Sequence, residues 1–146
     1  MKVSPETVNH MMSMAPQLAA LAVRVEEIGA GKALMRLPWS PALTISEESG
    51  IIAGGAVFTL LDSVLGAAVF TALKTLLPIS TLDLRIDYLR PAQGGADILA
   101  RAHCYRVTRH VAFVRGLAWD RDESDPLAHA SATFALDRLI GREASA

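Results

Sequence analysis

The segment GIIAGGAVFTLLDSVLGAAVF, residues 50–70, is almost wholly apolar and carries one charged side chain, Asp62. Burying an unpaired carboxylate costs several kcal/mol, so a sequence rarely places one in a core for packing alone. We therefore interpret Asp62 as a catalytic carboxylate held in a largely dry pocket. Two other interpretations stay open: a hydrogen-bonded structural aspartate, and an aspartate on a solvated helix face.

The composition is that of one globular domain. The chain has 146 residues, of which 51% are hydrophobic, enough to fill a sizeable core. We expect a single domain over residues 1–146, with its core at about residues 20–137. The formal net charge of −1 argues against a nucleic-acid binder, which needs a basic excess on one face.

Cysteine use and the N-terminal residues favour the cytoplasm. Cys104 is the only cysteine, so neither an intrachain disulfide nor a cysteine-based zinc cluster can form. This usage fits a reducing compartment. The first residues, MKVSPE, lack the apolar region of a secretory signal. We therefore expect a cytoplasmic protein.

The apolar stretch at residues 51–77 is long enough for a membrane span. Two charged side chains, Asp62 and Lys74, three glycines and the polar strand pattern that follows argue against one. A helix that is apolar on nearly all sides is also typical of the central helix of a soluble fold, covered by a sheet and a partner. We expect no contact with a membrane.

The element order predicts an α+β fold. Ser4 and Pro5 mark the start of a short helix that ends at about Ser13. The main helix is expected from about Ala53 to Leu73, ahead of Pro78. Alternating patterns predict strands at residues 22–28, 32–38, 81–88, 96–107, 111–120 and 127–136. An antiparallel sheet curled around the long helix would bury most of its faces.

This element order, with Gly54 and Gly55 opening the helix and Asp62 two turns later, resembles the hotdog-fold acyl-CoA thioesterases of the phenylacetate-pathway (PaaI-like) type. The string TLDLRIDYLRPA at residues 81–92 is similar to the strand-and-turn motif of that family, and RHVAFV at residues 109–114 resembles its next hairpin. The resemblance implies a hotdog fold and hydrolysis of an acyl-CoA thioester to the free acid and coenzyme A.

Two positions depart from the family pattern. The family usually has a histidine where this chain has Ala53, and many members have Asn or Gln where it has Glu47. An alternative function is therefore a catalytically weak hotdog protein that binds acyl-CoA or serves as an assembly module. A hotdog hydratase or dehydratase is a further alternative, although it usually needs a catalytic histidine that this helix start lacks.

The predicted catalytic residues are Asp62, Gly54, Thr81 and Glu47. Backbone N–H groups of Gly54 and Gly55 at a helix start favour a developing oxyanion, although tight packing alone also explains such glycines. Asp62 would activate water as a general base or attack the acyl carbon itself, and the sequence leaves both routes open. The resemblance places Thr81 where relatives hold the nucleophile. Glu47 would replace the missing amide, or is a solvated loop charge.

The remaining predictions concern substrate and assembly. We expect Gly55 to contact the substrate and Arg90, Arg109 and His110 to meet the phosphates of coenzyme A, although each cation alone also fits a plain surface charge. No metal and no cofactor are expected, because the other histidines lack metal spacing. Gly54 and Asp62 are eight residues apart, about 12 Å along a helix. This separation favours a homodimer with intersubunit sites, with a homotetramer left open.

Overall fold

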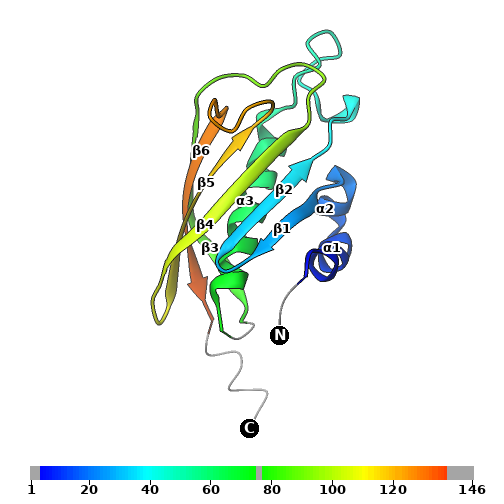
Figure 1. The fold of residues 1–146 in the computed structure, drawn as a ribbon. Coiled ribbons are helices and arrows are strands. Elements are labelled where there is room, and N and C mark those ends of the chain that lie inside the picture. Colours follow the sequence, from blue (N-terminus) through cyan, green and yellow to red (C-terminus); the bar gives the residue numbers. More distant parts are fainter. Residues whose placement is uncertain (1–3, 75–76, 138–146) are drawn as a thin grey trace.

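The computed structural model describes residues 4–74 and 77–137, in which one curved antiparallel sheet wraps a long helix (Figure 1). The strand order is β1-β2-β4-β5-β6-β3. The helices are α1 (Pro5–Ser13), α2 (Pro16–Leu21) and α3 (Gly54–Ala72), with a 3-10 turn, η1, at Pro41–Leu43. The strands are β1 (Arg24–Gly29), β2 (Lys32–Leu37), β3 (Ile79–Tyr88), β4 (Ile98–Val107), β5 (Val111–Trp119) and β6 (Ala128–Leu136). This arrangement confirms the predicted α+β hotdog fold.

Small residues on the inner face of the sheet let α3 approach it closely. The buried inward positions of the central strands are largely alanines: Ala100, Ala102, Ala112, Ala118, Ala128, Ala130 and Ala132. A Cβ at Gly116 would lie 2.6 Å from the carbonyl oxygen of Arg101 and 3.3 Å from the side chain of Leu65 on α3. Glycine at residue 116 is therefore required mainly by the close approach of the β4 backbone, and it also leaves room for Leu65 of α3.

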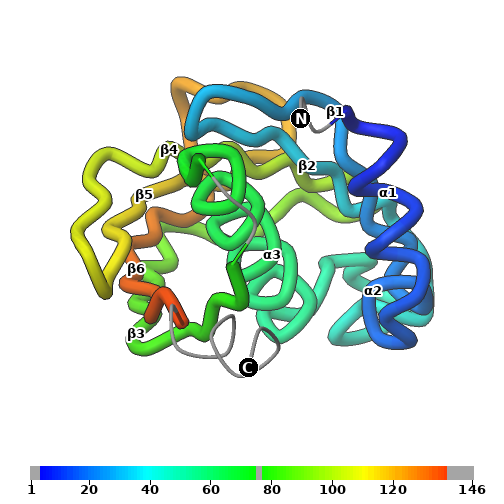
Figure 2. Tube along the Cα trace, turned by 90° about the horizontal axis from the view of Figure 1, so that it is seen from below, coloured from blue at the N-terminus to red at the C-terminus, as the bar shows by residue number. Residues whose placement is uncertain are grey.

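The apolar segment that suggested a membrane span is the core helix of this fold. Among the described residues, α3 is the one helix long and apolar enough to cross a bilayer. Eight of its residues are buried: Val57, Leu60, Leu61, Val64, Leu65, Ala67, Ala68 and Val69. Seen along its axis, α3 has the sheet around most of its circumference and α1 and α2 on one flank (Figure 2). Residues of these two helices, of α3 and of β3 together line a groove.

The N-terminal segment differs in part from the prediction. Ser4 caps α1, since its hydroxyl accepts from the backbone N–H of Thr7 at 3.3 Å, and α1 ends at Ser13 as predicted. The helix α2 was not predicted. It ends at Ala22, whose φ of 56° is left-handed, so the strand expected from residue 22 begins at Arg24 instead. A helix of six residues is too short to show a clear helical period.

Strand β3 lies at an edge of the sheet and is more exposed than its alternating pattern suggested. It pairs with β6 alone, and none of its residues is buried in the single chain. Leu84 and Ile86 on its inner face pack against the core, whereas Leu82 is 59% exposed at a β-bulge between Thr81 and Asp83. An edge strand of this length has unpaired backbone groups that are available to another chain.

Candidate active site

Asp62 meets Thr81 across the space between α3 and β3. The hydroxyl of Thr81 donates a hydrogen bond to Oδ1 of Asp62 at 3.0 Å. Asp62 is half-buried, and within the described part of the chain its Oδ2 has no hydrogen-bond partner. The threonine thus fixes one carboxylate oxygen and leaves the other available to a water molecule or an acyl carbon.

Asp62 lies in an apolar groove of about 380 Å³. Its described lining comes from α3, from the helices α1 and α2, and from the strands, β3 and β6 among them. Asp62 is the one charged side chain among its described lining residues. The predicted apolar surroundings of the carboxylate are therefore present, but in the single chain they are open rather than closed.

The start of α3 presents backbone donors with no competing side-chain cap. Ala53 at the N-cap position makes no capping hydrogen bond, and no acceptor for the N–H groups of Gly54 or Gly55 is found among the described residues. Gly55 borders a depression of about 280 Å³ between η1 and α2, and a Cβ there would meet nothing within 4 Å. These N–H groups lie at the positive end of the helix dipole, as an oxyanion requires.

Tyr88 is a site residue that was not predicted from the sequence. Its hydroxyl donates to the carbonyl oxygen of Gly54 at 3.0 Å and so ties the end of β3 to the first turn of α3. Partial burial raises the pKa of Tyr88, which keeps this hydroxyl protonated as a donor. The sequence showed Tyr88 within the motif at residues 81–92. It did not identify the partner of this hydroxyl, because Gly54 is 34 residues away in the chain.

Glu47 lies in a tight turn that precedes α3. Its side chain is exposed and, in the part of the chain described, makes no hydrogen bond or ion pair. The turn is firmly anchored nonetheless. The carbonyl oxygen of Gly50 accepts from Trp39 Nε1 at 2.8 Å and from the backbone N–H of Gly95 at 3.0 Å. Glu47 is not among the described residues that line the groove of Asp62, and its role stays a prediction.

We expect Gly94→Ala to loosen this turn. A Cβ on Gly94 would lie 2.3 Å from the carbonyl oxygen of Ser49, so the backbone of one loop must move. The cost should be about 1–3 kcal/mol of the free energy of unfolding, as for other overpacked sites. Urea denaturation measures it. The control is Gly55→Ala, whose Cβ meets nothing within 4 Å; equal stability of the two variants would contradict the proposed clash.

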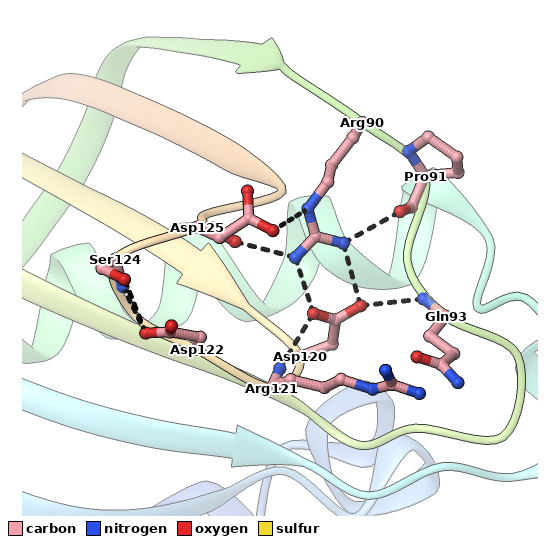
Figure 3. A network of polar contacts seen from close by, with 8 residues as sticks. All are labelled: Arg90, Pro91, Gln93, Asp120, Arg121, Asp122, Ser124 and Asp125. Carbon is pink, nitrogen blue, oxygen red and sulfur yellow. Dashed lines mark hydrogen bonds and ion pairs between the residues drawn. The ribbon is translucent and has the colours of Figure 1, made fainter.

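Arg90 lies at the end of the sheet near the turn that precedes α3, where it takes part in a dense polar network (Figure 3). It donates two hydrogen bonds to Asp120, at 3.1 and 2.7 Å, and one to the carbonyl oxygen of Asp125 at 2.7 Å. The side chain of Asp120 is 1% exposed and also accepts from the backbone N–H of Gln93. These contacts lower the pKa of Asp120, chiefly through the hydrogen bonds from Arg90.

In the single chain Arg90 is engaged by protein groups, and its contact with a phosphate stays a prediction. Its guanidinium already binds Asp120 and carbonyl groups, and its Nε lies 3.4 Å from a carboxylate oxygen of Asp125. We assign Arg90 the structural role of joining the loop after β3 to the β5–β6 hairpin. No local pattern indicated this role, because the partners are 30 and 35 residues away.

Arg109 and His110 lie at the other end of the molecule. They form the turn between β4 and β5, and Arg109 borders a depression of about 460 Å³ beside Lys74 and the last residues of α3. Gly54 is at the first turn of the same helix. A single chain therefore keeps Arg109 and His110 at the opposite end of α3 from its own Gly54 and Gly55.

Other chemistries find little support in the described residues. No cluster of three or more His, Cys, Asp or Glu side chains that could hold a metal ion occurs within residues 4–74 and 77–137. Burial raises the pKa of Cys104, so its thiol is a poor nucleophile near neutral pH. The catalytic role of Asp62 stays a prediction.

Comparison with known proteins agrees with this fold. Residues 49–126, more than half of the chain, match the model of the Thioesterase superfamily. A curated protein of Halobacterium salinarum named "Putative esterase" is 38% identical over 93 residues, 62% of this chain, and the chain spans 60% of that relative's length. A structure from Pseudomonas aeruginosa has a TM-score of 0.81 and 37% identity, covering 90% of this chain and 97% of the other. A point mutant of the phenylacetic acid degradation protein PaaI from Thermus thermophilus has a TM-score of 0.70 and 27% identity, covering 82% and 97%.

Proposed function

The chain belongs to the thioesterase superfamily as a hotdog protein of the PaaI-like type, and on this premise we propose that it hydrolyses acyl-CoA thioesters to the free acid and coenzyme A. Membership in the superfamily supports a hydrolase. The acyl-CoA substrate and the role of Asp62 are our proposal. We further propose that residues 1–146 act as one cytoplasmic domain without metal or cofactor.

One observation carries the proposal: Thr81 holds one oxygen of Asp62 at 3.0 Å while the other oxygen stays unpartnered among the described residues, in a groove otherwise free of charge. A carboxylate in such a place activates a water molecule or attacks the acyl carbon to form an anhydride that water then hydrolyses. In both routes the thioester oxygen gains negative charge. The N–H groups of Gly54 and Gly55 are the donors we assign to it.

The site is proposed to form between two subunits. Gly54 and Asp62 lie eight residues apart on α3, about 12 Å along its axis, too far for one thioester to meet both in a single chain. The groove along α3 and the edge of β3 that is unpaired in the single chain are the surfaces we assign to a second copy. A two-fold axis that sets two α3 helices antiparallel brings Gly54 of one chain toward Asp62 of the other.

The same two-fold symmetry would explain why Arg109 and His110 lie at the opposite end of α3 from Gly54. Arg109 and His110 lie near the C-terminal end of α3, and an antiparallel partner would bring its helix start toward them. We therefore retain both residues as proposed contacts for the phosphates of coenzyme A. Glu47, in the loop before α3, is retained as a proposed contributor to the partner's site. Further pairing into a tetramer stays open.

The function is tested by measuring thiol release from a panel of acyl-CoA esters. An active enzyme should release coenzyme A from at least one ester with a kcat/KM of about 10⁴ M⁻¹s⁻¹ or more, the lower end of the usual range. The absence of a histidine at Ala53 favours a second candidate, a protein that binds acyl-CoA without turnover. Tight binding with no thiol release from any ester would support that candidate and refute the hydrolase.

Mixing two inactive variants tests the shared site. Gly54→Pro removes one donor N–H at the first helical position, where proline is tolerated. Ala53, with φ −63° and ψ 145°, already has the conformation that a following proline requires. We expect homodimers of Gly54→Pro or of Asp62→Asn to be inactive. A mixed dimer should regain one intact site and about half of the wild-type rate per dimer.

The control for this experiment is a mixture in which both subunits carry Asp62→Asn, which should stay inactive. Subunit exchange is verified by native mass spectrometry. An active monomer, or no recovery in a verified mixed dimer, would contradict the intersubunit site.

A further inference from the structure

The face of the sheet that points away from α3 carries a second groove, of about 410 Å³, within the usual size range of small-ligand sites. Its described lining comes from β3, β4, β5 and β6. Side chains alternate between the two faces of a strand, so Ala112 and Val114 of β5 enter the core while Arg115 is exposed on the outer face. The sheet thus separates this outer groove from Asp62 and from the groove along α3.

The strand register gathers hydrogen-bond donors around Arg115. His103 of β4 and Ser131 of β6 lie directly opposite Arg115 on its two neighbouring strands. Arg101 and His129 lie two residues further along those strands, as diagonal neighbours at about 7–8 Å. All five side chains line the outer groove. They can therefore converge on one ligand.

The two guanidinium groups are oriented and still have donors to offer. Cζ of Arg115 lies 5.2 Å from the centroid of the Tyr105 ring, a cation–π contact that orients the side chain without using its N–H groups. Arg101 donates from Nε to Glu123 at 2.9 Å and from Nη1 to Glu27 at 3.5 Å. Within residues 4–74 and 77–137, neither Nη2 of Arg101 nor any N–H of the Arg115 guanidinium makes a hydrogen bond.

The charge around the outer groove favours an anion. Among its described lining residues Asp87 is the one carboxylate, and it accepts two hydrogen bonds from Arg85, at 3.2 and 3.1 Å. The row of paired residues that crosses the sheet from Lys32 through His103 and Arg115 to Arg85 contains no acidic side chain. Neighbouring cations repel each other, so such a row adds nothing to the stability of the sheet.

We propose that the outer groove binds a phosphate group, with the guanidinium of Arg115 as its main contact and Arg101 and Ser131 as further donors. An arginine fork matches two phosphate oxygens at once, and a hydroxyl group adds a donor. The ligand is inorganic phosphate or a small organic phosphate, whose organic part would lie on Leu117, between Arg101 and His129. This site does not depend on the proposed thioesterase function.

The test is calorimetry with inorganic phosphate and phenyl phosphate in about 150 mM sodium chloride, which screens weak long-range attraction. We expect a Kd of about 1 mM or tighter for at least one probe. Arg115→Gln should raise this Kd at least about tenfold, because the charged hydrogen bonds to the phosphate are lost. Arg115→Lys keeps the charge without the fork and should still raise the Kd at least about threefold.

Arg121→Gln is the matched control. Arg121 is exposed in the β5–β6 hairpin and does not line the outer groove, and its replacement removes the same charge. Its Kd should equal that of the wild type. The proposal would be overturned by no binding of either probe up to about 10 mM, by equal losses in Arg115→Gln and Arg121→Gln, or by wild-type affinity in Arg115→Lys.

NMR spectroscopy locates the bound phosphate, because the N–H groups at the start of α3 also attract anions. Amide shifts during a phosphate titration should centre on residues 115–117 and 129–131. Shifts confined to residues 54–55 would overturn the outer site. The ratio of the two Kd values then identifies the source of the phosphate. Phenyl phosphate bound at least about threefold tighter indicates an organic phosphate, and equal values indicate inorganic phosphate; both support the site.

Discussion

Asp62→Asn should lower kcat by at least about 10², the usual contribution of a general base, and by more where the carboxylate is the nucleophile. The amide is nearly the same size, and its oxygen can still accept the hydrogen bond that Thr81 donates at 3.0 Å. The folded structure should therefore persist, and the loss should appear in kcat rather than in KM. Steady-state kinetics on the best ester, with circular dichroism as a check of folding, measure it.

The matched control for this variant is Asp83→Asn. Asp83 is an exposed carboxylate on the same strand as Thr81, just beyond the β-bulge, and it does not line the groove. Its removal changes the charge of the protein equally and should leave kcat unchanged. Near wild-type turnover in Asp62→Asn, or equal losses in both variants, would refute the assignment of Asp62.

Asp120→Asn should give the largest loss of stability. The side chain of Asp120 is 1% exposed and accepts both guanidinium hydrogen bonds from Arg90, which is itself 29% exposed. Removing the negative charge of Asp120 leaves the positive charge of Arg90 without its main ion-pair partner. Breaking fully buried pairs costs about 3–5 kcal/mol, and partial exposure of Arg90 reduces this to about 2–3 kcal/mol. Urea denaturation near pH 7 measures the difference.

The pH dependence of this effect has a definite sign. The pKa of Asp120 is lowered in the folded protein, so the unfolded state binds more protons as the pH falls below its ordinary value of about 4. The contribution of Asp120 is thus fully present above about pH 4 and is lost as the pH falls through the folded pKa. The gap in free energy of unfolding between wild type and Asp120→Asn should narrow below about pH 4.

Asp125→Asn is the control. Its side chain is 73% exposed and contacts Arg90 through one ion pair of 3.4 Å, so its loss should be small. Equal losses for the two variants, or a gap that widens toward acid, would contradict the role given to Asp120.

The sequence predicted the elements well where local pattern decides them. The apolar run at residues 50–70 placed the long helix within one residue at each end, because its length and flanking residues leave one interpretation. The alternation of apolar and polar residues likewise located all six strands of the described chain. It did not reveal that β3 is an edge strand with no buried residue, because exposure depends on strand order and not on period.

Site residues were predictable only where a known pattern carried them. Thr81 was paired with Asp62 through the family resemblance, and the structure places their side chains in contact across 19 residues of sequence. The hydroxyl of Tyr88 on Gly54 and the carboxylate of Asp120 on Arg90 were missed, since no local signal identifies a partner 30 or more residues away. From the sequence, Arg90 was therefore interpreted as a cation available to a ligand.

The two edges of the sheet are not equivalent. At β1, the side chain of Asn9 occupies the outward N–H and carbonyl of Val25, so this edge is blocked against another strand. At β3, ten residues have no neighbour on their outer side in the single chain. A chain with one open edge can pair with one other chain, and the pair then has no open edge left. If two copies pair at β3, growth by strand addition would stop at two, because Asn9 occupies backbone groups at the other edge.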